Sequence, residues 1–211
     1  MSVGALPHEA YLTAMSVLEG LGPSTLRRLA SLGDPADTWV ALRRGTLPVA
    51  ALGGPGPGSG GDAPTGTGGG ARPGADRRLE MWRLAAQRID PAQIWDRLRH
   101  HDVGVASLGA AGYPQSLLDD PDPPVLVFHR GDLCALDRPT VAVVGTRRAT
   151  AYGLDVAHQL GRGLAEVGVC VVSGLALGID AAAHAGACSA DGAGPAAVVA
   201  AGLDAPARGS P

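Results

Sequence analysis

The stretch VAVVGTRRATAYG, residues 141–153, decides how this chain folds. Its first four residues are valine and alanine, which favour a buried strand, and that strand runs into Gly145. The residues that follow are mostly polar or basic, and the apolar spacing beyond them favours a helix. A strand that turns at a glycine into a helix N-terminus is a common phosphate-binding arrangement. The open question is whose phosphate it holds: that of a dinucleotide, a free nucleotide or a nucleic-acid backbone.

The residues beyond this stretch continue the alternation of strand and helix. Strands are predicted over 140–144, 169–173 and about 196–201, and helices over about 154–167 and 179–190. The first helix has one apolar face, formed by Leu154, Ala157, Leu160, Leu164 and Val167. Continuous apolar strands separated by helices predict an α/β fold, a Rossmann-like parallel sheet covered on both sides. Right-handed crossovers would place the loops 146–153 and 174–178 at the same carboxyl edge.

These two loops form the candidate binding site, and its chemistry suits an anion. Arg147 can bind two phosphate oxygens at once, and the helix N-terminus near Gly153 adds a positive end. The second loop adds the hydroxyl of Ser173 and an open backbone N–H at Gly174. The alternative is that both arginines of the first loop are solvated charges. The expected phosphate-binding set is Gly145, Thr146, Arg147, Arg148, Thr150, Tyr152, Gly153, Ser173, Gly174, Gly178, Ile179 and Asp180.

Several enzyme classes lack their motifs here. A dinucleotide fingerprint needs Gly-x-Gly-x-x-Gly after the first strand and an acidic residue after the second, and a P-loop needs lysine; neither pattern occurs. Asp180 and His184 lie four residues apart on one helical face. They could therefore act together as the catalytic base of a hydrolase, or form half of a metal site. The favoured interpretation is structural: Asp180 caps its helix, and His184 bonds a neighbouring loop. We expect no catalytic residue, cofactor or metal.

Composition bounds the remaining possibilities. All 17 basic residues are arginine, and the net charge of −3 argues against broad wrapping of duplex DNA. The three cysteines show no CxxC spacing, which predicts neither a disulfide framework nor a zinc site. No signal peptide or membrane span is apparent, so a cytoplasmic location is expected.

The chain divides into four predicted regions. Residues 1–52 are expected to be helical and contain Gly20-Leu21-Gly22-Pro23, which suits either a helix-hairpin-helix turn near phosphate or a plain helix corner. Residues 53–75 form a Gly/Pro-rich linker, and residues 76–101 a helical segment broken at Pro91. Its buried faces are expected at Leu79, Trp82, Leu84, Ile89, Ile94, Trp95 and Leu98. Residues 102–211 hold the Rossmann-like domain.

Taken together, three spaced motifs resemble the DprA/Smf family of DNA-processing proteins. They are VAVVGTRRATAYG, VVSGLALGIDAAAH and AAVVAAGLD, preceded by the lead-in YPQSLLDDPDPPVLVFHRGDL. The resemblance covers about residues 102–204 and implies a Rossmann-like protein that binds single-stranded DNA. It also implies transfer of that strand to the RecA recombinase and protection of incoming DNA during natural transformation. A homodimer is a further expectation.

The family pattern carries over residue by residue to both loops. Its Gly-[Ser/Thr]-Arg turn matches residues 145–147, and its second loop matches 173–174 and 178–180. Tyr152, as the aromatic residue of the first loop, is the candidate for base stacking. After residue 204 the family continues with Tyr-Pro, whereas this chain reads APARGSP, so we expect a C-terminally truncated domain. The alternatives are a phosphoribohydrolase-type nucleotide enzyme on a related scaffold, whose Pro-Gly-Gly-x-Gly-Thr-x-x-Glu motif is missing, or a nonfunctional remnant.

Overall fold

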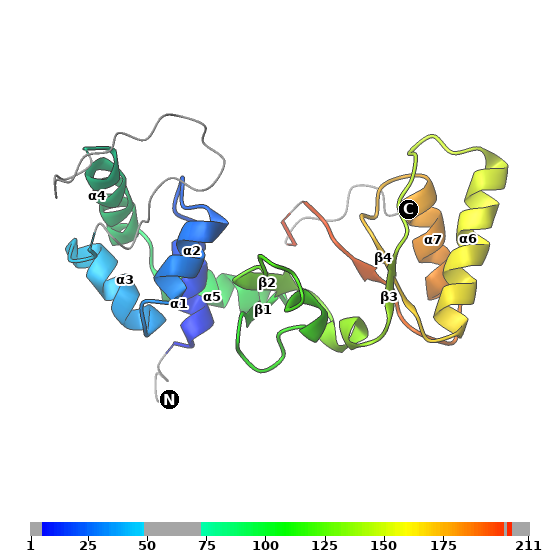
Figure 1. Cartoon of the computed structure of the whole chain (residues 1–211), viewed down its shortest axis with the longest axis horizontal. Coiled ribbons are helices and arrows are strands. Elements are labelled where there is room, and N and C mark those ends of the chain that lie inside the picture. Colours follow the sequence, from blue (N-terminus) through cyan, green and yellow to red (C-terminus); the bar gives the residue numbers. More distant parts are fainter. Residues whose placement is uncertain (1–5, 49–72, 201, 204–211) are drawn as a thin grey trace. The chain divides into compact units, whose positions relative to one another are not determined.

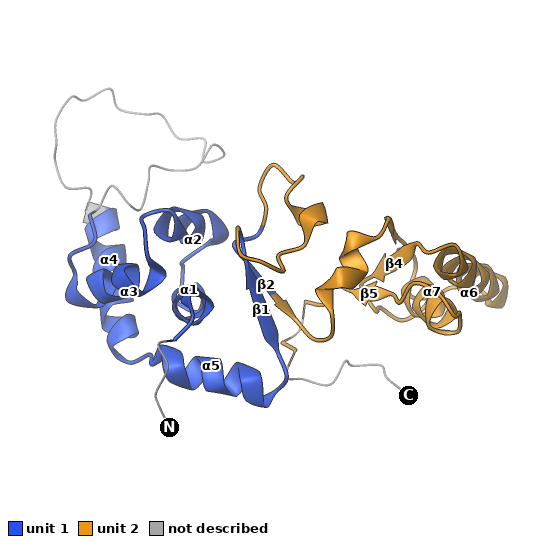
Figure 2. Cartoon of the chain, turned by 90° about the horizontal axis from the view of Figure 1, so that it is seen from below, with its two compact units in different colours: residues 1–108, 124–127 blue, residues 109–123, 128–211 orange. Residues whose placement is uncertain are grey.

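The computed structural model describes residues 6–48, 73–200 and 202–203. These residues fall into two compact units (Figure 2): unit 1 comprises residues 1–108 and 124–127, and unit 2 comprises residues 109–123 and 128–211. Most of the linker predicted at 53–75, and the segment 204–211, lie outside the described residues.

Unit 1 is mainly helical (Figure 1), as the sequence predicts for both of its helical regions. Four of its helices begin with proline, which suits the first helical position because that position needs no N–H. Asp34 and Asp90 cap two of them by accepting backbone N–H groups of the first turn. The predicted break at Pro91 is confirmed. The helices are α1 (His8–Ser16), α2 (Pro23–Ala30), α3 (Pro35–Arg44), α4 (Pro73–Gln87) and α5 (Pro91–His100).

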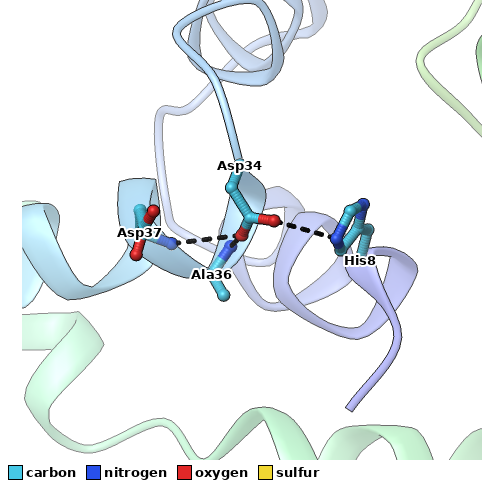
Figure 3. Close-up of polar contacts among 4 residues, drawn as sticks. All are labelled: His8, Asp34, Ala36 and Asp37. Carbon is cyan, nitrogen blue, oxygen red and sulfur yellow. Dashed lines mark hydrogen bonds and ion pairs between the residues drawn. The ribbon is translucent and has the colours of Figure 1, made fainter. Parts of the chain in front are cut away.

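Asp34 also connects two helices of unit 1 (Figure 3). One of its carboxylate oxygens accepts the N–H groups of Ala36 (2.7 Å) and Asp37 (3.4 Å), and the other lies 2.9 Å from Nε2 of His8 on α1. Both side chains of this contact are exposed, so its contribution to stability is small. The cap therefore stabilises α3 mainly through its backbone hydrogen bonds.

The core of unit 1 is built from leucine, methionine and tryptophan. The indole N–H of Trp82, 3% exposed, donates to the carbonyl of Glu19 at 2.8 Å, so this buried ring leaves no polar atom unpaired. One expected core position is wrong: Leu84 is 47% exposed, and Ala86, one turn beyond Trp82, is buried instead. The buried cluster includes Leu12, Met15, Leu18, Leu21, Leu26, Leu29, Trp39 and Leu42.

A two-stranded sheet pairs β1 (Gly104–Ser107) with β2 (Leu126–His129). Beyond β1, the N–H of Leu108 donates to the carbonyl of Val125 at 2.9 Å. The hydroxyl of Ser107 donates to Glu9 on α1 at 2.7 Å, which fixes the end of this strand to the helices. The two strands therefore form a sheet of their own.

Unit 2 contains the predicted strand–helix alternation. Its parallel sheet has the order β3-β4-β5, with Val141 opposite Val171 and Val172 opposite Ala196. This arrangement confirms the α/β class with a Rossmann-like parallel sheet. The elements are η2 (Gln115–Leu117), η3 (Leu133–Asp137), β3 (Thr140–Ala142), α6 (Ala151–Glu166), β4 (Cys170–Ser173), α7 (Ile179–Cys188) and β5 (Ala196–Ala197).

The sheet of unit 2 is not covered on both sides within the described residues, which corrects the expectation from the strands. The strand order follows the chain order without reversal, so right-handed crossovers place α6 and α7 on the same face, side by side (Figure 1). Apolar side chains of the strands and their ends stay exposed: Val141 at 41%, Val144 at 73% and Val198 at 70%. A second helical layer requires the strand order to reverse, and it does not within these residues.

The helices α6 and α7 pack through small residues. The expected apolar face of α6 is wrong for most of its members, because Leu154, Leu160 and Val167 are 37%, 49% and 74% exposed. Of the predicted face, Ala157 is buried and Leu164 is partly buried. The buried face runs through Ala157, Gly161 and Ala165, which are spaced four residues apart. Small side chains allow the two helix backbones to approach closely, and that approach rather than leucine packing defines the interface.

Candidate nucleic-acid interface

Two loops meet at the carboxyl edge of the parallel sheet, as predicted. Loop 1, residues 145–150, follows β3, and loop 2, residues 174–178, follows β4. Because the strands are parallel neighbours, both loops emerge at the same edge. Each loop leads into the N-terminus of a helix, α6 and α7 respectively. The sheet thus brings together residues that are about 30 positions apart in the sequence.

Asp180, on the first turn of α7, holds the two loops together. Its Oδ1 accepts the N–H of Gly145 at 3.0 Å, and its Oδ2 accepts the N–H of Gly174 at 3.1 Å. Asp180 is 5% exposed, so its carboxylate is shielded from bulk water, while the two glycines that donate these charge-assisted bonds are exposed. The expectation that it caps its own helix is wrong: the cap position is Gly178, without a side-chain bond. The carboxylate bridges two loops instead.

The backbone makes a second connection between the loops. The N–H of Ile179 donates to the carbonyl of Thr146 at 3.3 Å. Gly178 has a φ of +93°, and a Cβ built on it would lie 2.2 Å from that same carbonyl oxygen. The side chain of Ile179 covers Gly145, whose own Cβ would meet it at 2.7 Å. Loop 1 therefore rests directly on the beginning of α7.

The threonine hydroxyls of loop 1 shape its backbone. Oγ1 of Thr146 accepts the N–H of Arg148 at 3.2 Å, and Oγ1 of Thr150 caps α6 by accepting the N–H of Gly153 at 3.1 Å. A hydroxyl that accepts one bond still has its own O–H to donate. Both groups can therefore donate to a ligand without releasing the loop.

The exposed side of loop 1 is basic and aromatic. Arg147 and Arg148 are exposed, and neither guanidinium has a hydrogen-bond or ion-pair partner among the described residues. Tyr152, in the first turn of α6, is 79% exposed. The exposed basic and aromatic side chains of the predicted set thus lie on loop 1 and the start of α6.

Ser173 and Gly174 do not offer the open groups that the sequence predicts. The N–H of Gly174 is bound to Asp180, and Ser173 is 3% exposed. The Ser173 hydroxyl lies 3.1 Å from Nδ1 of His184 and accepts the N–H of Leu175 at 3.4 Å. The structural interpretation of His184 is therefore confirmed, since it is bound at the base of loop 2. A serine–histidine pair can activate a nucleophile, but this serine is closed to substrate.

Burial lowers the pKa of His184, so its imidazole is neutral at neutral pH. The unfolded chain, with a histidine pKa of about 6.5, then binds more protons than the folded chain below neutrality. The stability that this group contributes is complete above the unfolded pKa and is lost as pH falls through the folded pKa. We expect the free energy of unfolding to decrease as pH falls from about 7 through the unfolded pKa of about 6.5 and on through the lower folded pKa. His184→Gln, which cannot titrate, should flatten that decrease in urea titrations; equal slopes would contradict the assignment.

Other functional groups are sparse in the part of the chain that the structure describes. No group of three or more potential metal ligands occurs there. Cys134 and Cys188 are exposed, Cys170 is buried, and all three are free thiols. No described helix is long and apolar enough to cross a membrane.

Comparison with known proteins places the chain in a family. Residues 104–208 match the family model of DNA recombination-mediator protein A. DNA processing protein DprA of Bacillus subtilis is 36% identical over 95 residues, which cover 44% of this chain and 32% of that protein. Protein Smf of Synechocystis is 29% identical over 181 residues, 83% of this chain and 40% of that protein.

A solved structure is similar in fold over most of the chain. The X-ray structure of DprA from Streptococcus pneumoniae matches with a TM-score of 0.68 and 26% identity, over 96% of this chain and 61% of that one. The chain thus spans less than two thirds of the length of each of these proteins. The motifs of both loops, the parallel sheet and these similarities agree, and the chain belongs to the DprA/Smf family.

Proposed function

We propose that unit 2 binds single-stranded DNA through the exposed side of loop 1. The observation that carries this proposal is the pair of guanidinium groups of Arg147 and Arg148, which are exposed and unpartnered within the described residues, beside the exposed ring of Tyr152. Guanidinium groups bind phosphate oxygens in pairs, and aromatic rings stack on unpaired bases. A flexible single strand can present both its phosphates and its bases to such a surface.

The frame beneath this surface supports the same proposal. Asp180 and Gly178 fix loop 1 against α7. The side chain of Arg147 therefore extends from a fixed backbone. A pre-organised site loses less conformational entropy on binding. The residues of the predicted set therefore divide into two roles, with Thr146, Arg147, Arg148, Thr150 and Tyr152 contacting DNA and Gly145, Gly153, Ser173, Gly174, Gly178, Ile179 and Asp180 supporting them.

We further propose that this protein has the family's role, with unit 2 as its DNA-binding part. In that role the protein is cytoplasmic, acts as a homodimer, protects single strands that enter during natural transformation and transfers them to the RecA recombinase. No bond is broken in this process, so the site needs binding groups rather than a nucleophile. Membership of a recombination-mediator family supports this proposal.

The test is the affinity of the Arg147→Ala variant for a fluorescently labelled oligothymidylate, measured by anisotropy. Loss of a guanidinium that binds phosphate through two oxygens costs about 1–3 kcal/mol, so we expect affinity to fall about 5- to 150-fold. The slope of log K against log salt should also decrease by about 0.7, because one phosphate contact is lost.

Arg162→Ala is the matched control. Arg162 is an exposed arginine of unit 2 that pairs with Glu166 along α6, so its removal changes the net charge equally without touching loop 1. We expect its affinity to stay within about twofold of the unsubstituted chain, as for a distant exposed charge. If the two variants bind equally, Arg147 is no specific DNA ligand and the site assignment fails.

A further inference from the structure

The glycine turns of unit 2 already contain an anion, and that anion belongs to the protein. In a nucleotide-binding Rossmann-like fold, backbone N–H groups of a glycine turn and a helix N-terminus bind the phosphate. Here the N–H groups of Gly145 and Gly174 both point at the Asp180 carboxylate, at 3.0 and 3.1 Å. The same carboxylate lies in the first turn of α7, where the helix favours negative charge.

The two amides that could bind a second anion are already occupied by the carboxylate. Asp180 is 5% exposed, and a Cβ on Gly174 would lie only 3.2 Å from its Oδ2. Ile179 covers Gly145 from the other side. A phosphate that approached these two amides would have to displace a buried carboxylate that already satisfies them, against repulsion between like charges.

We propose that Asp180 is a specificity-determining residue: its carboxylate fills the anion position of the glycine turns and excludes the phosphate of a free nucleotide. Phosphates can then be held only from outside, by the exposed side chains of loop 1. The binding of phosphates by the exposed side chains of loop 1 rests on the proposed DNA-binding function, whereas the filled anion position does not. As a consequence, the site does not bind the abundant mononucleotides of a cell but can still bind a phosphodiester chain.

The first experiment removes the Asp180 carboxylate by substitution and adds formate, a small free carboxylate, to take its place. In Asp180→Gly the two amides lose their acceptor, and formate can supply the same two oxygens. At a formate concentration about ten times its dissociation constant the folding equilibrium shifts about elevenfold. The melting temperature of unit 2 in this variant should therefore rise by about 6 to 11 °C over that in chloride of equal ionic strength.

Two controls isolate the effect. Asp155→Gly makes the same substitution at an exposed position on α6, where the carboxylate binds only the Gln159 side chain among the described residues, so formate should act as chloride does. Asp180→Asn keeps the position filled and should not respond either. If formate does not stabilise Asp180→Gly beyond these controls, the anion position does not exist. A variant with no cooperative transition at any formate concentration would overturn the proposal equally.

The second experiment uses the unsubstituted chain and amide NMR spectra. Added AMP should leave the amide signals of Gly145 and Gly174 unchanged, whereas oligothymidylate should shift those of Thr146 and Arg147. Saturable shifts of the glycine amides with AMP would overturn the exclusion. Absence of shifts with oligothymidylate would instead overturn the proposed function and leave the role of Asp180 standing, so the two failures can be told apart.

Discussion

Replacing Gly161 with valine should lower the free energy of unfolding of unit 2 by about 3 kcal/mol or more. A Cβ at this position would lie 2.0 Å from the carbonyl oxygen of Ala183 on α7 and 2.8 Å from its carbonyl carbon. Because the obstacle is backbone, no change of side-chain rotamer can remove it. The helices α6 and α7 must move apart, and their buried alanines then lose their contacts.

The contact at Gly161 has a counterpart on the other helix. A Cβ on Gly186 of α7 would lie 2.0 Å from the carbonyl oxygen of His158 on α6. Each helix thus has a glycine against which the backbone of the other helix packs. Moving the helices apart at one glycine therefore also breaks the contact at the other. This pairing explains why a single added side chain should have so large an effect.

The measurement is a thermal melt of the full chain, together with hydrogen exchange of peptides from residues 151–188. We expect the melting temperature of unit 2 to fall by more than about 12 °C. Gly163→Val makes the same substitution two residues further along α6, where nothing lies within 4 Å of the added Cβ. That control should change stability by no more than about 0.5 kcal/mol. Equal effects of the two substitutions would show that helix propensity, not the helix contact, governs the response.

The strand–helix alternation of unit 2 could be predicted from the sequence, because hydrophobic periodicity reports which residues are buried. Elements near 140–144, 154–167, 169–173 and 179–190 all occur, and the two loops lie at one sheet edge. Periodicity could not identify the buried face of α6, since it weights leucine and valine above glycine. A signal was available nonetheless: Gly161 costs a helix about 1 kcal/mol relative to alanine, and close backbone packing is a common compensation.

The candidate site was predictable in its location but not in its internal contacts. The residue types of loop 1 identify the basic side chains, and exposure of a charged loop residue is the default. The bond between Gly145 and Asp180 joins residues 35 positions apart and depends on how α7 meets the sheet. The sequence does not show whether a backbone N–H is already bound by a distant carboxylate. The N–H of Gly174 is therefore predicted to be open, although it binds Asp180 in the structure.

The second large effect should follow from Gly178→Ala. At a φ of +93° a residue with a Cβ is strained, and here that Cβ would also lie 2.2 Å from the carbonyl oxygen of Thr146. Relief requires loop 1 to lift away from α7, which breaks the bond between Ile179 and Thr146. We expect a loss of about 2–4 kcal/mol in stability and a fall of at least about tenfold in affinity for single-stranded DNA, because Arg147 loses its fixed position.

Gly168→Ala separates strain from contact in this prediction. Gly168 follows α6 and has a φ of +82°, but nothing lies within 4 Å of an added Cβ. Its substitution should therefore cost about 1 kcal/mol through backbone strain alone and leave DNA affinity unchanged. Anisotropy with oligothymidylate and urea unfolding of both variants test the difference. If Gly178→Ala loses stability but keeps its affinity, the contact of loop 1 with α7 supports the fold without positioning the DNA-binding side chains.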